Sequence, residues 1–138
     1  MTTKIFVNLP VQSLERSVAF YTQLGYTFNQ KFTDENATCM VVSDDIYVML
    51  LVKPFFQTFI DKPIADTHKS VSAIISINAE DRAAVDVLVD KAVAAGAKSP
   101  EAKDYGFMYQ RGYEDPDGHQ WEVFYMDENA DPNAIQAG

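Results

Sequence analysis

Apolar and polar positions in the first half of the chain follow two different periods. Between residues 13 and 24 the apolar side chains recur at helical spacing, with Ser13 placed to cap the helix and Gly25 placed to end it. The flanking segments show the alternation or the short apolar runs that are typical of β-strands. In order along the chain, the pattern predicts a strand at 4–9, a helix at 13–24, and strands at 26–32, 37–43 and 46–53.

The second half of the chain repeats this order after a polar stretch at 61–70. The two predicted helices both end in a glycine, Gly25 and Gly96, and the offset between the halves is about seventy residues throughout. The first strands also correspond, because Ile5-Phe6-Val7-Asn8-Leu9 parallels Ile74-Ile75-Ser76-Ile77-Asn78. The predicted elements of this half are a strand at 71–78, a helix at 80–95, a loop at 99–104, a strand at 105–112, a turn at 115–118 and a strand at 120–126.

The repeated order predicts an α+β fold of two tandem βαβββ modules. One helix covers only one face of a four-stranded sheet, so the other face must cover a ligand, the second module or a partner chain. We expect the two curled sheets to form a cup-shaped cleft, the usual kind of place for a small ligand. The predicted domain spans 1–127, with module one at 1–60, a linker at 61–70, module two at 71–127 and a loose C-terminal tail at 128–138.

The composition of the chain indicates which kinds of partner and which cellular compartment to expect. The chain has 138 residues and is 47% apolar, enough for one domain with a real core. Its net charge of −9 disfavours nucleic acid as a partner and leaves open the attraction of a cationic ligand. A single cysteine, Cys39, suits a reducing compartment and is expected to be buried in a strand. Because no targeting or membrane-spanning segment is visible, we expect a cytoplasmic protein without a membrane partner.

Two motifs stand near opposite ends of the duplicated chain. The first is Val11-x-x-Leu14-x-x-Ser17-x-x-Phe20-Tyr21-x-x-Leu24-Gly25-Tyr26, and the second is Glu114-Asp115-Pro116-Asp117-Gly118-His119-Gln120-Trp121-Glu122. They resemble the N-terminal and C-terminal signatures of the glyoxalase / bleomycin-resistance / extradiol-dioxygenase (vicinal oxygen chelate) family. Together with the repeat, the resemblance covers about 125 of the 138 residues.

The resemblance implies four positions at which metal-dependent members of the family place His, Glu or Gln ligands. In this sequence those positions fall at Phe6, Met49, Ser72 and Glu122. A phenyl ring cannot bind a metal, a thioether suits hard or borderline ions poorly, and a serine hydroxyl is a weak ligand. One carboxylate does not make a metal site, so we expect neither a bound metal nor another cofactor.

Glu122 is the candidate for chemistry in the cup. It could act as a general acid or base, anchor a ligand through hydrogen bonds or an ion pair, or serve only as a structural hydrogen-bond partner. Strand alternation places His119 on the opposite face, and His68 is expected to be exposed in the linker. The residues predicted to line the cup are Phe6, Asn8, Met49, Ser72, Gln120, Glu122 and Phe124.

These observations leave three functional hypotheses. The first is a metal-independent protein that binds a cationic or aromatic small molecule, as the resemblance to the bleomycin-resistance branch implies. The second is a lyase or dioxygenase-type enzyme of the same family, and the third is metal-free acid–base catalysis by Glu122. We also expect a homodimer, with the run Phe55-Phe56-Gln57-Thr58-Phe59 either in its interface or folded as a local cap over module one.

Overall fold

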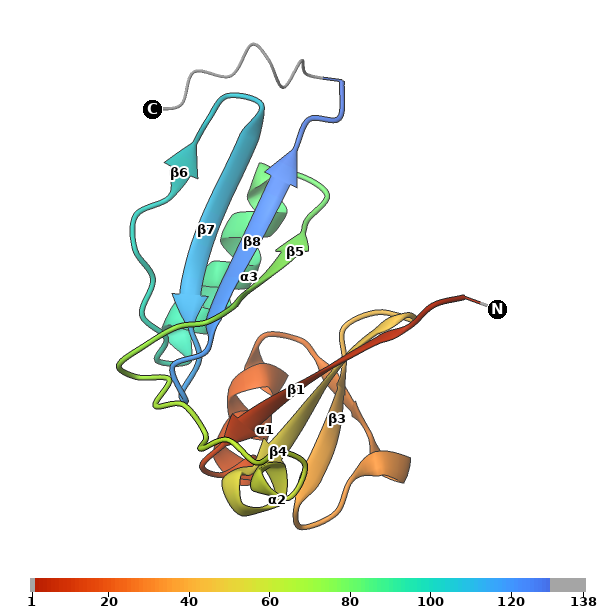
Figure 1. Ribbon diagram of the computed structural model, residues 1–138. Coiled ribbons are helices and arrows are strands. Elements are labelled where there is room, and N and C mark those ends of the chain that lie inside the picture. The colour runs from red at the N-terminus through yellow and green to blue at the C-terminus, as the bar shows by residue number, and fades with distance from the viewer. Residues whose placement is uncertain (1, 130–138) are drawn as a thin grey trace. The chain divides into compact units, whose positions relative to one another are not determined.

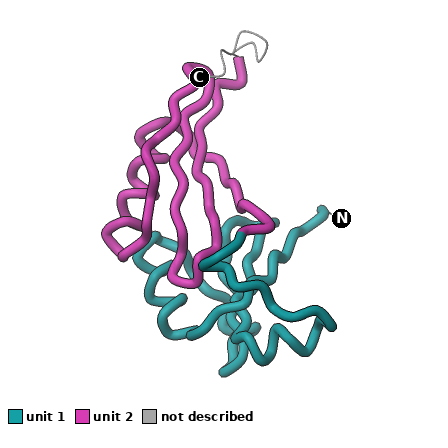
Figure 2. Tube along the Cα trace, turned by 60° about the vertical axis from the view of Figure 1, so that its left-hand side comes forward, with its two compact units in different colours: residues 1–70 teal, residues 71–138 magenta. Residues whose placement is uncertain are grey.

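The computed structural model describes residues 2–129 and divides the chain into two compact units, 1–70 and 71–138 (Figure 2). From residue 130 onward, the predicted C-terminal tail lies outside the described residues. Each unit carries one four-stranded mixed sheet and one long helix (Figure 1). The predicted α+β fold of two tandem modules is therefore confirmed.

Module one, in the first unit, has the strand order β1-β4-β3-β2. β1 runs parallel to β4, and the two remaining pairs are antiparallel. Its elements are β1 (Ile5–Val11), α1 (Leu14–Gln23), β2 (Thr27–Asn29), the 3-10 helix η1 (Gln30–Phe32), β3 (Ala37–Val41), β4 (Ile46–Val52) and α2 (Lys53–Gln57).

Module two, in the second unit, repeats this topology with the strand order β5-β8-β7-β6. β5 runs parallel to β8, and the other pairs are again antiparallel. Its elements are β5 (Ile74–Asn78), α3 (Arg82–Ala94), β6 (Lys103–Asp104), β7 (Met108–Glu114) and β8 (Gln120–Met126).

The helices begin and end close to the predicted residues for local chemical reasons. The Ser13 hydroxyl accepts a hydrogen bond from the backbone N–H of Arg16 at 3.2 Å, which caps α1. Asp81 caps α3 in the same way, accepting from the backbone N–H of Ala84 at 2.7 Å, so this helix begins at 82 and not at 80. Gly25 follows α1 with a φ of 102°, a conformation that favours glycine.

Three predicted strands differ from the observed ones. The strand predicted at 26–32 stops at Asn29, whose side chain accepts from the backbone N–H of Lys31 at 3.0 Å and starts η1. The strand predicted at 71–78 begins only at Ile74, where pairing with β8 begins. The strand predicted at 105–112 is observed as β7, which begins three residues later. A turn at Gly106 (φ 84°) precedes it and connects it to β6, a short strand inside the predicted loop that pairs with β7.

One helix covers one face of each sheet. In module one, α1 packs against β4, and Phe20 and Tyr21 are buried together with Val48 and Leu50. In module two, α3 lies along β7 and β8 (Figure 1) and buries Val85, Val89 and Ala92 at helical spacing. Under this helix, the rings of Tyr113 and Trp121 stack with centroids 6.1 Å apart. The opposite face of each sheet has no such cover from its own helix.

A polar network also ties α3 to its sheet. Arg111 donates to Asp86 at 3.1 Å and to Asp90 at 2.8 Å, and the Tyr109 hydroxyl donates to Asp86 at 2.7 Å. The hydrogen bond to Asp86 raises the pKa of Tyr109. At the other end of the helix, Arg82 pairs with Asp104, which lowers the pKa of that carboxyl. Among the described residues, no helix is long and apolar enough to cross a membrane.

The hydroxyl of Tyr26 generates a stability prediction. The ring meets that of Tyr21 edge-on at 6.1 Å, while its hydroxyl is buried without a hydrogen bond within the described part of the chain. Burial raises the pKa of Tyr26 to about 12. A buried polar group left unpaired costs about 1–3 kcal/mol, so Tyr26→Phe should leave the free energy of unfolding at pH 7 unchanged or raise it by about 1 kcal/mol.

The same substitution should change the alkaline pH dependence. The folded pKa lies above the unfolded value, so the contribution of Tyr26 is fully present below about pH 10 and is lost as the pH rises towards 12. In urea unfolding, the free energy of unfolding of Tyr26→Phe relative to the wild type should therefore be higher at pH 10.5 than at pH 7.

Tyr109→Phe is the comparison variant. It removes the hydrogen bond to Asp86 and should lower the free energy of unfolding by about 1 kcal/mol at pH 7. A clear loss of stability in Tyr26→Phe at pH 7 would contradict the statement that the Tyr26 hydroxyl is buried without a hydrogen bond.

Candidate functional site

The register between β1 and β4 determines which side chains share the open face of module one. Asn8 lies opposite Met49, and Phe6 lies opposite Tyr47. Paired residues on neighbouring strands point to the same side of the sheet, so these four side chains stand in two rows on the face away from α1. Of the predicted cup residues in this module, the register therefore places Asn8 beside Met49 and Phe6 one row further along β1.

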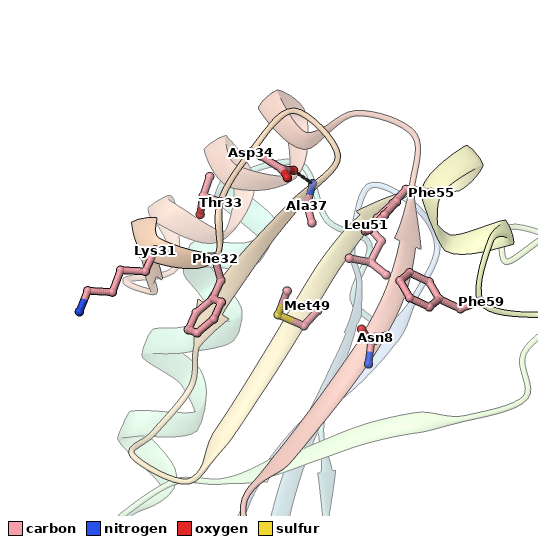
Figure 3. A pocket seen from close by; sticks show the side chains of 10 residues that line it. All are labelled: Asn8, Lys31, Phe32, Thr33, Asp34, Ala37, Met49, Leu51, Phe55 and Phe59. Atoms are coloured by element: carbon pink, nitrogen blue, oxygen red, sulfur yellow. Dashed lines mark hydrogen bonds between the residues drawn. The ribbon is translucent and has the colours of Figure 1, made fainter.

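A cleft of about 420 Å³ opens on this face (Figure 3). Its floor is formed by side chains of β3 and β4, and η1 and α2 stand on opposite sides of it. The residues that line it are Asn8, Lys31, Phe32, Thr33, Asp34, Ala37, Met49, Leu51, Phe55 and Phe59.

Phenylalanine rings form the two walls of the cleft. Phe32 comes from η1, and Phe55 and Phe59 come from α2 and the turn that follows it (Figure 3). The rings of Phe55 and Phe59 meet edge to face, with centroids 5.1 Å apart. Phe32 is 60% exposed and Phe59 is 66% exposed, so both walls present apolar surface that the described protein leaves uncovered. A ring-shaped ligand would find an aromatic contact on either side.

Polar groups are few in this cleft. The Asn8 amide donates to the carbonyl of Phe6 at 3.3 Å. The Asp34 carboxylate accepts from the backbone N–H groups of Asn36 at 2.8 Å and Ala37 at 3.0 Å, both through Oδ1. Lys31 belongs to the rim, and Figure 3 shows its ammonium group directed away from the floor. The cleft therefore offers the amide of Asn8, the hydroxyl of Thr33 and the carboxylate of Asp34 beside its apolar surface, with the ammonium group of Lys31 at the rim.

Phe6, a predicted cup residue, does not line this cleft. Its ring stacks on that of Tyr47, with centroids 4.8 Å apart and an angle of 13° between the planes. The ammonium group of Lys4 lies 5.4 Å from the centre of the Tyr47 ring, a cation–π distance. Phe6 remains 50% exposed at this end of the open face.

On module two, Glu122 occupies the middle of the open face. It pairs with Ser76 on β5 and with Gly112 on β7, and the Ser76 hydroxyl donates to its carboxylate at 3.1 Å. A small pocket of about 100 Å³ adjoins Glu122 and Gln120. Phe124 lies further along β8 on the same face, opposite Asn78. Gln120, Glu122 and Phe124 thus share one face of β8.

The structure places Ser72 outside the strand that pairs with Glu122. Ser72 precedes β5 and is exposed, and the residue that lies beside Glu122 is Ser76, four positions later. The register of a parallel pair is set by the packing of both strands, and the sequence motif around Glu122 contains no information about its partner strand.

Neither the two histidines nor Cys39 lines the cleft of module one or the pocket beside Glu122. His119 is buried in the turn after β7, where its backbone N–H donates to Asp115 at 2.9 Å. His68 is exposed between the modules' elements. Cys39 is buried on β3, and burial raises the pKa of its thiol, which makes it a poor nucleophile.

The donor groups do not fit a metal centre of the kind the family resemblance implies. On module one the paired open-face positions offer the Asn8 amide, the Met49 thioether and the thiol of Cys39, which is buried opposite Met49. On module two they offer the Ser76 hydroxyl and the Glu122 carboxylate. Zinc and iron sites use imidazole, thiolate or several carboxylates. Within residues 2–129, no group of three or more His, Cys, Asp or Glu side chains lies close enough together to hold an ion.

Two repeated βαβββ modules with open mixed sheets define a class of proteins, that of the glyoxalase / bleomycin-resistance / dioxygenase fold. Residues 3–43 match the family model described as bleomycin resistance protein-like N-terminal. A comparison with curated protein sequences gives no match. The family resemblance predicted from the two motifs is confirmed by the family model and by the fold.

Solved structures share the fold over most of their length. A hypothetical protein from S. aureus is 25% identical, with a TM-score of 0.77 over 91% of this chain and 94% of its own. A glyoxalase-related enzyme from Fulvimarina pelagi is 20% identical, with a TM-score of 0.77 over 91% and 88%. TnmS3, an antibiotic binding protein from Streptomyces sp. CB03234, is 17% identical, with a TM-score of 0.66 over 91% and 97%.

Sequence reasoning missed most of the residues that form the aromatic cleft. Phe32 was assigned to a strand, and Phe55 and Phe59 to a short helix that forms either an interface or a local cap. One signal was available, because Phe55 and Phe59 are four residues apart, a spacing that places two side chains on the same side of a helical turn. Asp34 was assigned only to a turn, which it does form.

Glu122→Gln separates a structural role of the carboxylate from a functional one. The amide keeps the shape and can still accept from Ser76, a residue that is itself exposed, so the free energy of unfolding at pH 7 should change by no more than about 1 kcal/mol. Urea unfolding measures this change, and Ser76→Ala, which removes the same hydrogen bond from the other side, is the control. If Glu122→Gln lowered the free energy of unfolding by several kcal/mol and Ser76→Ala did not, the carboxylate would have a structural role in the sheet.

Proposed function

We propose that the protein binds a small molecule, without a metal, in the aromatic cleft of module one. The observation that carries this proposal is the pair of exposed phenylalanine walls, Phe32 on one side and Phe59 on the other, above an apolar floor at Met49 and Leu51. The volume of about 420 Å³ lies within the range of ligand pockets, roughly 300–1,000 Å³. Covering the two rings with a ligand removes apolar surface from water.

The chemistry of the lining favours a flat aromatic ligand with a positive charge. The rings of Phe32, Phe55 and Phe59 offer faces that attract cations, and both their faces and their edges can pack against other rings. The Asp34 carboxylate lies at the edge of the same cleft, and the Lys31 ammonium group at the rim points away from the floor. The net charge of −9 raises the local concentration of cations around the whole protein. TnmS3, which shares the fold, is an antibiotic binding protein, and this supports the binding of a small molecule without indicating its charge.

The two enzymatic hypotheses have less support. A lyase or dioxygenase that works through a divalent ion needs ligands that the paired positions do not supply. Metal-free acid–base catalysis is favoured by one observation, the carboxylate of Glu122 beside the Ser76 hydroxyl in an open pocket. That pocket, of about 100 Å³, is small for a substrate.

Titration with two fluorescent dyes tests the binding function. Proflavine, a flat aromatic cation, should bind more tightly than the anion 8-anilinonaphthalene-1-sulfonate, and the difference should narrow as salt is raised from 10 to 150 mM, since salt screens charge. Phe59→Ala and Phe32→Ala should each weaken proflavine binding about tenfold, equivalent to about 1.4 kcal/mol.

Glu122→Gln provides the matched control on module two and should leave proflavine binding unchanged. Equal losses in Phe59→Ala and Glu122→Gln would show that the ligand depends on both open faces, and the single-module proposal would then be wrong. Unchanged binding in both phenylalanine variants would exclude the aromatic cleft as the site.

We also propose that the protein is a homodimer. Apolar side chains at the start of β1 and β4 remain exposed, with Ile5 at 54%, Phe6 at 50% and Ile46 at 38%, and β1 is an edge strand of its sheet. Multi-angle light scattering at micromolar concentration should therefore report a mass near twice 15.5 kDa. Phe6→Ser should lower that mass, whereas Phe59→Ala should not if Phe59 serves the ligand and not the dimer. A monomer for the wild type would refute the dimer.

A further inference from the structure

Phe59, the most exposed wall of the cleft, stands outside regular structure. α2 ends at Gln57, and Phe59 lies in the turn that follows it. Short backbone hydrogen bonds begin the turn, from the N–H of Thr58 to the carbonyl of Phe55 at 3.0 Å and from the N–H of Phe59 to that of Phe56 at 3.1 Å. The Thr58 hydroxyl also donates to the carbonyl of Phe55 at 2.7 Å, and a longer bond runs from the N–H of Ile60 to the carbonyl of Gln57 at 3.5 Å. None of these bonds reaches Lys62, so the far end of the segment needs another support.

The side chain of Gln57 supplies that support. Its amide nitrogen donates to the carbonyl of Lys62 at 2.8 Å and to that of Ile60 at 3.3 Å. A carboxamide NH₂ has two donors, and both are used here on the chain just beyond Phe59. The Gln57 side chain thus holds the two ends of the segment 57–62 together, and Phe59 lies between these ends.

We infer that Gln57 is a positioning residue of the ligand site and acts through Phe59 without lining the cleft itself. The inference rests on the proposed function. The Phe59 ring reaches the cleft because the turn folds back over Phe55, and the edge-to-face contact at 5.1 Å holds only while the turn is closed. A closed turn lowers the entropy that Phe59 loses when a ligand covers it, and this preorganisation strengthens binding.

The opposite wall is held by separate bonds. The Thr33 hydroxyl, next to Phe32, donates to the carbonyl of Asn29 at 2.8 Å and bonds the hydroxyl of Thr38 on β3 at 2.9 Å. Asn29 in turn accepts from the backbone N–H of Lys31. These bonds connect η1 to the sheet and involve no residue of the turn at 57–62. Loss of the Gln57 bonds should therefore loosen one wall and leave the other in place.

Gln57→Met is the central variant, because methionine keeps the length of the side chain and its neutral charge but has no N–H donor. Proflavine should bind about fivefold more weakly to this variant. In a Phe59→Ala background the same substitution should have no further effect, whereas in a Phe32→Ala background the fivefold loss should persist. Gln23→Met, the same change at an exposed position near the end of α1, is the control and should bind like the wild type.

Hydrogen–deuterium exchange without any dye gives an independent readout. Gln57→Met should speed exchange in a peptide covering 55–64 and leave a peptide covering 29–38 unchanged. Slow exchange at 55–64 in the variant would overturn the positioning role even if dye binding were weaker. A fivefold loss that persists in the Phe59→Ala background would also overturn it, since Gln57 would then act by another route.

The two proposals fail in different ways. If the wild type binds no proflavine but exchange at 55–64 rises in Gln57→Met, the turn is held as inferred and the proposed ligand class is wrong. If proflavine binds, and Gln57→Met changes neither affinity nor exchange, the binding function stands and the inference about Gln57 is wrong.

Discussion

A single helix can cover only one face of a four-stranded sheet, and this constraint governs both modules. α1 and α3 bury their apolar stripes on one side, and the parallel pairs β1–β4 and β5–β8 then place every second side chain on the opposite side. What a module can bind depends on which residues occupy those alternate positions. In each strand, the side chains that point towards the helix pack in the core, and the alternate side chains point to the open face that holds the candidate site.

The two open faces have become different in spite of their common topology. In module one the paired positions are Asn8 and Met49, and in module two they are Ser76 and Glu122. The larger difference comes from segments outside the repeat, because η1 and α2 add aromatic walls to module one, and within residues 71–129 no helix stands in the corresponding places. The aromatic walls of the cleft thus come from the connections, whereas its floor comes from the repeated strands. This agrees with the general observation that loops on a rigid scaffold carry binding residues.

These connections are held by side chains that bond to backbone groups. Asn29, Thr33 and Asp34 fix the segment around Phe32, and Gln57 closes the turn around Phe59. Each is a polar residue whose bond to a nearby backbone group starts or closes a turn. Under the proposed function, a substitution at these positions should move an aromatic wall and change the affinity for a ligand.

The sequence alone determined the elements whose causes are local. Hydrophobic periodicity, the Ser13 cap and Gly25 placed α1, the repeat predicted two modules, and the ligand positions of the family motif indicated a donor set unsuited to a metal. Only the tertiary structure decided the register that puts Ser76, and not Ser72, beside Glu122. The tertiary structure also places Phe32 and Phe59 on opposite sides of one cleft. Both depend on contacts between segments more than twenty residues apart, and no local pattern encodes which of them will face each other.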